Sequence, residues 1–378
     1  MYSNDQIMEF FNQSCSSEYF NSNPDEVVIT DKFGFIQETL NLKKAKSINL
    51  SDNSTRDSIS DFQGMSGLSK SQFQISVEKQ SPSSSNSQED LKRENVRVQK
   101  WMDMLQTDPK MKQYKTYKRR PDKYLDGKDK SQYYQSLIAQ QGDRYNIKTI
   151  FKDVTRTFTD HTFFKDRFGK GQKTLFCVLK ALSLHDPEIG YMQGMGYMAG
   201  MFLTQLDEED AFACMIALHY GPTNHREYFK TKMPGLARAY YIHLTLMKKF
   251  MPKLFQHLLD NSITPQLYST QWFMTIFSSS LPHECILRIW DIYLVEGRKI
   301  QYRVALALLK LVQQEILAQN MEMDMIYVNI KKIVEKINPD TLIQTAMTFS
   351  FTNRKLRKID YEYENKPNKE IIKYCLMS

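Results

Sequence analysis

The sequence predicts an all-α protein built around one large helical domain. From Leu91 onward apolar residues recur at helical spacing, whereas the alternation typical of strands is nearly absent. Hydrophobic residues make up 41% of the 378 residues and aromatic residues 12%, and their clustering after residue 91 supplies a sizeable core. We therefore expect a single domain with two helical lobes over residues 91–350, between an N-terminal region, 1–90, and a charged C-terminal tail, 351–378.

Residues 1–90 lack the helical pattern. The stretch 47–90 is crowded with Ser, Gln, Asn and Asp, including a serine-rich run that begins at Ser81. Such a segment cannot bury enough apolar surface to offset the entropy lost on ordering, so we predict that residues 1–90 are disordered. Its serines fit either phosphorylation sites or a plain solvating tail.

Helical spacing continues through the domain. A helix is expected over 173–184, and another over 211–220, which Asp207 would cap ahead of a first turn rich in acidic residues. The uncharged stretch 189–206 carries four glycines and several polar residues, which favours a buried core helix over a membrane span. Further helices are expected over 96–105, 237–257, 271–278, 284–295, 304–318 and 323–337.

The charge and cysteine content narrow the class of protein. A formal charge of +8 is spread along the chain, with one dense patch from Lys110 to Lys130. That patch fits a solvated face, or contact with an acidic partner or a membrane surface, and we expect no nucleic-acid partner. Five cysteines without C-x-x-C spacing, behind a start that lacks a signal peptide, indicate reduced thiols in a cytoplasmic protein.

The sequence carries no pattern for a metal or a nucleotide of its own. Its seven histidines lack metal-ligand spacing. Residues 169–174 resemble a phosphate loop but lack the Gly-Lys-Thr run and the preceding strand. Residues 194–199 fit the loose dinucleotide fingerprint without a βαβ unit around it. We therefore expect no metal and no cofactor, and any nucleotide chemistry would act on a nucleotide held by a partner.

Two short segments point to such chemistry. Asp153 and Arg156 stand three residues apart, so on a helix they share a face and the carboxylate can hold the guanidinium. Gln193 stands beside Gly194, where the chain can approach another surface closely. GTP hydrolysis needs an Arg to neutralise charge on the phosphoryl oxygens and a Gln amide to orient the attacking water. An ordinary surface ion pair would show the same Asp-x-x-Arg spacing.

The order and spacing of four motifs resemble the TBC-domain family of Rab GTPase-activating proteins. The motifs are Ile150-x-x-Asp153-x-x-Arg156-Thr-Phe158, Gly190-Tyr191-x-Gln193-Gly194-Met195, Gln271-Trp272-Phe273, and Leu287-Arg288-Ile-Trp290-Asp291-Ile-Tyr293-x-x-Glu296-Gly297. The similarity extends over about residues 91–312.

The resemblance implies a role for each matching residue. Arg156 would be a catalytic arginine finger and Gln193 a glutamine finger that places the water. Asp153 would orient Arg156, and Tyr191 would support the Gln193 loop. The structural positions are Trp272 and Trp290, with Trp290 in the core, and Arg288 and Asp291, which we expect to form a local ion pair.

The partner that the resemblance implies is a Rab-family small GTPase in its GTP state. The GTP and the magnesium ion would belong to that partner. The protein would act in vesicle trafficking from the cytoplasm, where peripheral contact with endomembranes would bring it to Rab proteins.

The sequence departs from the family upstream of Arg156. The family usually carries a Lys-Gly-Ile-Pro segment there, and in this chain Lys118-Arg119-Arg120-Pro121-Asp122 runs into Tyr124-Leu125-Asp126-Gly127. The departure supports an alternative, a non-catalytic Rab-binding scaffold with the same fold, whereas the presence of both fingers favours an activator. A helical protein unrelated to GTPases is a third reading.

The last four residues, Cys375-Leu-Met-Ser378, satisfy the C-a-a-X prenylation pattern. Lys366, Lys369 and Lys373 would add attraction to anionic lipid. A lipid anchor at Cys375 and a chance match are both open readings of this pattern.

Overall fold

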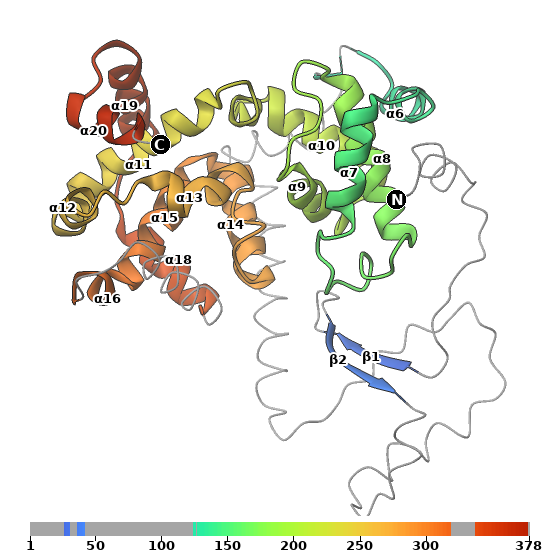
Figure 1. The fold of residues 1–378 in the computed structure, drawn as a ribbon, viewed down its shortest axis with the longest axis horizontal. Helices are drawn as coiled ribbons and strands as arrows, with labels where there is room; N and C mark the ends of the chain where they lie inside the picture. Colours follow the sequence, from blue (N-terminus) through green and yellow to red (C-terminus); the bar gives the residue numbers. More distant parts are fainter. Residues whose placement is uncertain (1–25, 31–35, 42–123, 126, 319–336, 377–378) are drawn as a thin grey trace, which may run out of the picture. The chain divides into compact units, whose positions relative to one another are not determined.

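The computed structural model describes residues 26–30, 36–41, 124–125, 127–318 and 337–376 (Figure 1). They fall into two compact units. The larger unit contains the described helices, and the smaller one contains two strands together with Asp160–Thr162. The predicted helices over 96–105 and 323–337 lie outside the described residues, apart from residue 337.

The strands form an antiparallel ribbon. β1 (Glu26–Thr30) pairs with β2 (Ile36–Asn41), with Val28 opposite Thr39. The run Val-Val-Ile in β1 is β-branched, which favours extended backbone. We predicted disorder for residues 1–90, and β1 and β2 are the parts of that region that the structure describes. The other residues of that region lie outside the described part of the chain.

The first helical lobe is built around α8 (Lys170–His185). This helix contacts α6 (Lys130–Ile138), α7 (Arg144–Val154), α9 (Met195–Leu203) and α10 (Glu208–Tyr220), drawn in green shades in Figure 1. α8 can touch so many neighbours because most of its residues are apolar or small and are buried.

Aspartate caps fix where three helices of this lobe begin. Asp129, Asp143 and Asp207 each accept a hydrogen bond from the backbone N–H three residues on, at 2.8–2.9 Å. The predicted cap at Asp207 is thereby confirmed, and Asp143 sets the start of α7, the helix that precedes Arg156.

The second lobe contains the rest of the described helices. α11 contacts α12, α13, α15, α19 and α20, and α15 contacts α14, α16 and α18. The bounds are η4 (His225–Tyr228), α11 (Pro234–Phe250), α12 (Pro252–Asp260), α13 (Pro265–Met274), α14 (His283–Glu296), α15 (Lys299–Leu311), α16 (Gln313–Ala318), α18 (Pro339–Thr348), α19 (Asn353–Asn365) and α20 (Lys369–Leu376).

Prolines explain where these helices differ from the prediction. The helix expected over 237–257 is divided into α11 and α12 because Pro252 cannot continue a helix and instead begins the next one. The helix expected over 271–278 begins earlier, at Pro265, and ends at Met274.

The stretch 189–206 is helical over α9 alone, and no described helix is long and apolar enough to cross a membrane.

Residues 351–378 were predicted as a charged tail, and the structure corrects this. Residues 353–365 and 369–376 form α19 and α20, which both pack on α11. Leu356, Ile359, Ile371 and Tyr374 are each at most 2% exposed. Because these apolar residues lie three residues apart on each helix, they form one buried face although the segment is rich in charge.

Candidate functional site

Arg156 lies in a turn directly after α7. The helix ends at Val154, and the backbone N–H of Arg156 donates to the carbonyl oxygen of Asp153 at 3.1 Å. We expected Arg156 on the helix itself; it lies two residues beyond the end. The turn leaves 54% of the Arg156 side chain exposed, whereas the Asp153 side chain is 8% exposed. An arginine in this position is accessible to a partner protein, because about half of its side chain is in solvent.

Asp153 holds the guanidinium of Arg156, as the spacing predicted. Arg156 Nε and Nη2 donate to Asp153 Oδ1 at 3.0 and 2.5 Å. Charge-assisted bonds from two nitrogens restrict the rotation of the guanidinium plane. Arg156 is therefore oriented before any partner arrives.

Tyr191 provides the second bond to the same carboxylate. Its hydroxyl donates to Asp153 Oδ2 at 2.8 Å, from a side chain that is 3% exposed. Burial, and then the negative charge of Asp153, raise the pKa of the Tyr191 hydroxyl far above its usual value, so that it stays a protonated donor. We expected Tyr191 to support the loop of Gln193, and its hydroxyl also fixes the residue that orients Arg156.

Asn146 is a residue of this site that the sequence did not reveal. Its Oδ1 accepts the backbone N–H of Tyr191 at 3.0 Å. Gly190 adopts φ +65°, and a Cβ at that position would come within 2.7 Å of Asn146 Nδ2. Asn146, Ile150 and Asp153 are spaced four and three residues apart on one face of α7, and this periodicity was the available signal.

Gln193 occupies an exposed turn at the start of α9. The next residue, Gly194, has φ +106° and precedes the first residue of α9. This conformation is open to glycine and strained for other residues. A Cβ on Gly194 would also approach Thr275 Cγ2 to 3.3 Å, so the turn packs closely against the segment that follows α13.

The segment that follows Arg156 packs on the small residues of α9. A Cβ on Gly196 would lie 3.2 Å from Thr157 Oγ1, and one on Gly200 would lie 2.8 Å from the ring of Phe158. The two glycines are one helical turn apart, so they form a flat strip against which Thr157 and Phe158 lie. The arginine and the glutamine segments are thus held by direct packing as well as by hydrogen bonds.

Arg156 and Gln193 line the same surface hollow, of about 470 Å³. Its other lining residues come from α7: Tyr145, Lys148, Thr149, Lys152 and Asp153. A pre-oriented cation and an amide that face one open space can together act on a phosphate group and on a water molecule.

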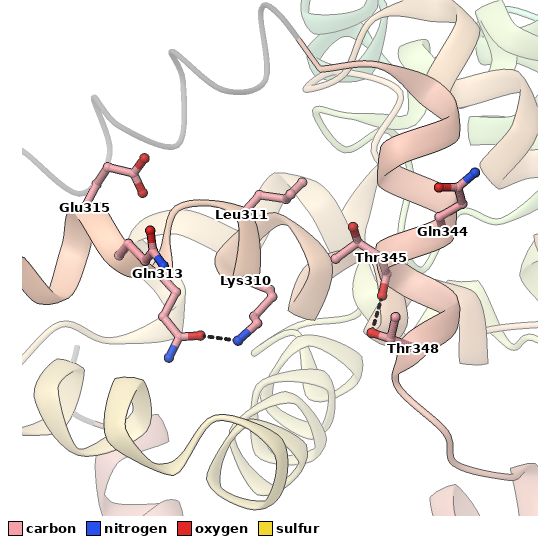
Figure 2. Close-up of a pocket in the computed structure, with 8 residues that line it drawn as sticks. Lys310, Leu311, Gln313, Glu315, Gln344, Thr345 and Thr348 are labelled. Atoms are coloured by element: carbon pink, nitrogen blue, oxygen red, sulfur yellow. Dashed lines mark hydrogen bonds between the residues drawn. The ribbon is translucent and has the colours of Figure 1, made fainter.

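A second hollow lies elsewhere, between α15, α16 and α18 (Figure 2). It is lined by polar side chains, where Lys310 Nζ donates to Gln313 Oε1 at 2.9 Å and Thr348 Oγ1 donates to the carbonyl of Thr345 at 2.7 Å. None of the predicted site residues lines it. Among the residues that the structure describes, no group of three or more His, Cys, Asp or Glu could hold a metal ion.

The predicted structural residues lie in the second lobe. Trp272 and Trp290 are 3% and 5% exposed, and Trp290 Nε1 donates to the carbonyl of Ile276 and to Ser278 Oγ. Trp290 is thus confirmed as a core residue, and its ring also contacts Phe202 of α9 edge to face.

The predicted local pair of Arg288 with Asp291 is corrected. In the described part of the chain, the carboxylate paired with Arg288 is that of Asp340, 52 residues further on. Asp340 lies in the first turn of α18, where the helix dipole favours a carboxylate. Arg288 therefore joins α14 to α18 rather than stabilising its own helix.

The thiol of Cys375 is buried. Its residue is 5% exposed, its carbonyl accepts a hydrogen bond from Gln266 Nε2 at 2.6 Å, and burial raises the pKa of the thiol to about 12. Lipid transfer to Cys375 would therefore require α20 to leave its place beside α11 and α13.

Comparison with known proteins gives a match to one domain family and to several related proteins. The family described as Rab-GTPase-TBC domain matches residues 94–317. The human ecotropic viral integration site 5 protein homolog is 37% identical over 226 residues, which cover 59% of this chain and 28% of that protein. The Caenorhabditis elegans Rab GTPase-activating protein eat-17 is 32% identical over 225 residues, 59% of this chain and 25% of that protein. The chain thus spans less than a third of the length of these relatives.

Solved structures agree in fold. The RabGAP TBC domain of a Chlamydomonas flagellar protein matches with a TM-score of 0.54 and 26% identity, covering 69% of this chain and 94% of that domain. The Ypt/Rab-GAP domain of Gyp1p matches with a TM-score of 0.50 and 15% identity, covering 65% and 81%, which shows a shared fold. With the family match over more than half of its length, this chain belongs to the Rab-GTPase-TBC domain family.

Proposed function

We propose that this protein accelerates GTP hydrolysis on a Rab-type small GTPase by supplying Arg156 and Gln193 in trans. The observation that carries the proposal is that both side chains line one open hollow, where Asp153 binds both Arg156 and Tyr191, two residues before Gln193. The naming of several relatives as Rab GTPase-activating proteins supports the choice of partner.

The proposed chemistry follows from the charge that develops during phosphoryl transfer. Negative charge accumulates on the phosphoryl oxygens, and the guanidinium of Arg156 would neutralise it. The amide of Gln193 would hold the attacking water in line with the bond that breaks. The GTP and its magnesium ion come with the partner, so neither finger has a substrate until the two proteins meet.

The hydrogen bonds of this site would orient Arg156 before the partner binds. An arginine that is free in solution loses rotational freedom when it meets a phosphate, at a cost of about 0.5–1.5 kcal/mol. The paired bonds to Asp153 Oδ1 remove part of that freedom in advance. The same carboxylate binds the hydroxyl of Tyr191, two residues before Gln193, so the segments of both fingers meet at Asp153.

A Rab-type partner implies a role in vesicle trafficking, with the protein acting at the cytoplasmic face of endomembranes. Membrane attachment through Cys375 would need a conformation other than the one described, since that thiol is buried between helices.

The test is single-turnover GTP hydrolysis by a panel of purified Rab proteins. Wild-type protein is compared with Arg156→Ala, Gln193→Ala and the control Lys253→Ala, whose exposed side chain lies in α12. We expect wild type and the control to accelerate hydrolysis on one or a few Rab proteins. Arg156→Ala should lose about 10³- to 10⁵-fold of that rate.

Binding separates the activator from the alternative that the sequence left open. If folded wild-type protein binds a GTP-loaded Rab protein and hydrolysis is no faster, the protein is a scaffold and the proposed activity is wrong. If both finger variants activate as well as wild type, the acceleration comes from other residues and the assignment of Arg156 and Gln193 is wrong.

A further inference from the structure

The outward face of α7 forms a basic stripe that leads away from Arg156. Tyr145, Lys148 and Lys152 are spaced three and four residues apart, and Arg156 follows four residues later. All four are exposed and line the same hollow. With a rise of 1.5 Å per residue, the stripe places positive charge about 6 and about 12 Å along the helix from Arg156.

The positive charge of this stripe is not balanced inside the molecule. In the described part of the chain, Lys148 and Lys152 have no carboxylate within 4.0 Å. The one carboxylate in the hollow, Asp153, already accepts bonds from Arg156 and Tyr191. The hollow is therefore lined by three cationic side chains and by one carboxylate, which already has hydrogen-bond partners.

The stripe gives little to the stability of α7. Like charges four residues apart on a helix are destabilising by a few tenths of a kcal/mol. Lys152 lies in the last turn, where the helix dipole offsets part of this effect, whereas Lys148 is one turn earlier. Tyr145, at the far end, leaves 74% of its surface in solvent. Tyrosine and arginine are both enriched on surfaces that another protein covers.

The distances indicate what kind of group the stripe meets. Arg156 is the residue that would reach the phosphates, and a lysine about 12 Å further along the helix lies beyond the span of a triphosphate held at Arg156. For Lys148, the matching negative charge would then come from side chains of the partner protein beside its nucleotide. Tyr145 would pack on an apolar part of the same surface.

We propose that Tyr145, Lys148 and Lys152 form a docking stripe for an acidic segment of the partner GTPase. This inference rests on the proposed function. Exposed charges of this kind increase the rate of encounter and select among partners, and they contribute little to the chemical step. GTPases with carboxylates at the matching position would be activated at lower concentrations than those with neutral or basic residues there.

The experiment uses the full chain and the Rab protein that wild type activates best. The variant is Lys148→Glu/Lys152→Glu, and the control is Lys253→Glu/Lys358→Glu, which reverses two exposed lysines on α12 and α19 and so gives the same net charge. Single-turnover hydrolysis is measured against activator concentration at several salt concentrations. We expect the half-saturating concentration of the variant to rise on the order of tenfold or more at low salt, with a weaker salt dependence.

The rate at saturation should stay within about twofold of wild type, because the fingers are unchanged. The control should match wild type in both quantities, and thermal unfolding verifies that all proteins are folded. An unchanged half-saturating concentration and salt dependence would overturn the docking stripe. A fall in the saturated rate at constant half-saturation would also overturn it, because the lysines would then act in the chemistry.

Failure of the proposed function gives a different result. If wild type accelerates no GTPase, affinity for GTP-loaded Rab proteins is measured with the same variants. Weaker binding by the stripe variant alone would keep the docking stripe while the activator role falls. Equal binding by all variants, or none by wild type, would refute the stripe.

Discussion

Replacing Tyr191 by Phe tests whether its bond to Asp153 stabilises the fold and supports the proposed action of Arg156. The hydroxyl of Tyr191 donates to Asp153 Oδ2 at 2.8 Å inside the first lobe, and the other carboxylate oxygen receives Arg156. Tyr191→Phe removes one oxygen atom and keeps the ring, so that packing in this almost fully buried position is preserved. Asp153 then loses a hydrogen bond that no water can easily replace at 8% side-chain exposure.

The structure sets the size of the effect. A hydrogen bond to a charged group contributes about 1.5–3 kcal/mol to the free energy of unfolding. A domain of this size shifts its melting temperature by about 2–4 °C per kcal/mol, so we expect a decrease of roughly 3–12 °C. The guanidinium of Arg156 becomes less restricted, which costs up to about 1.5 kcal/mol of transition-state stabilisation, or roughly a tenfold lower saturated rate.

Thermal unfolding and single-turnover hydrolysis at saturating activator measure the two effects. Tyr361→Phe, at a position that is 65% exposed, is the matched control and should change neither quantity. A melting temperature and a saturated rate equal to those of wild type would refute the reasoning, because the bond would then contribute nothing. A lower melting temperature with an unchanged rate would limit Tyr191 to a structural role.

Three further substitutions test other contacts of the helical domain. Asn146→Leu should lower the saturated rate more than Asn146→Asp, which keeps an oxygen acceptor for the backbone of Tyr191; equal rates would contradict this role. Gly200→Ala should lower the free energy of unfolding by about 1–3 kcal/mol, measured by denaturant titration, since its Cβ would meet the Phe158 ring at 2.8 Å. Burial lowers the pKa of His243 to about 3, so the unfolded chain takes up the proton first as pH falls below 6.5. The free energy of unfolding should therefore fall by about 2 kcal/mol for this group between pH 7.5 and 5, and His243→Phe should reduce that slope; identical pH profiles would show that folding does not lower the pKa of His243.

Local patterns in the sequence were sufficient for much of the fold. α8 and α10 were predicted close to their bounds. The apolar spacing of a buried face and the Asp207 cap can both be recognised within a short stretch of sequence. The packing of α19 and α20 was not, since their buried faces are narrow and their neighbour, α11, is more than 100 residues earlier. Charged residues dominate the composition of that segment, and only the partner helix shows that the apolar minority is buried.

In the candidate site, too, contacts between residues close in sequence could be predicted, whereas contacts between distant residues could not. Asp153 and Arg156 are three residues apart, so their bond could be predicted from helical spacing, although the end of α7 at Val154 could not. Tyr191 is 38 residues from Asp153 and 45 from Asn146. Contacts of that separation depend on how α7 lies against the turn before α9, and a single sequence gives no measure of that arrangement.

These contacts assign two tasks to opposite faces of one helix. The inner face of α7 carries Asn146 and Asp153, which fix the segment of Gln193 and the side chain of Arg156. The outer face carries Lys148 and Lys152, which have no such bonds in the described residues. Changes on the inner face should therefore alter the rate at saturation, whereas changes on the outer face should alter the concentration needed to reach it. Because substitutions on the outer face leave the hydrogen bonds of the inner face intact, we expect that they can change the preferred partner without changing the proposed role of Arg156 and Gln193.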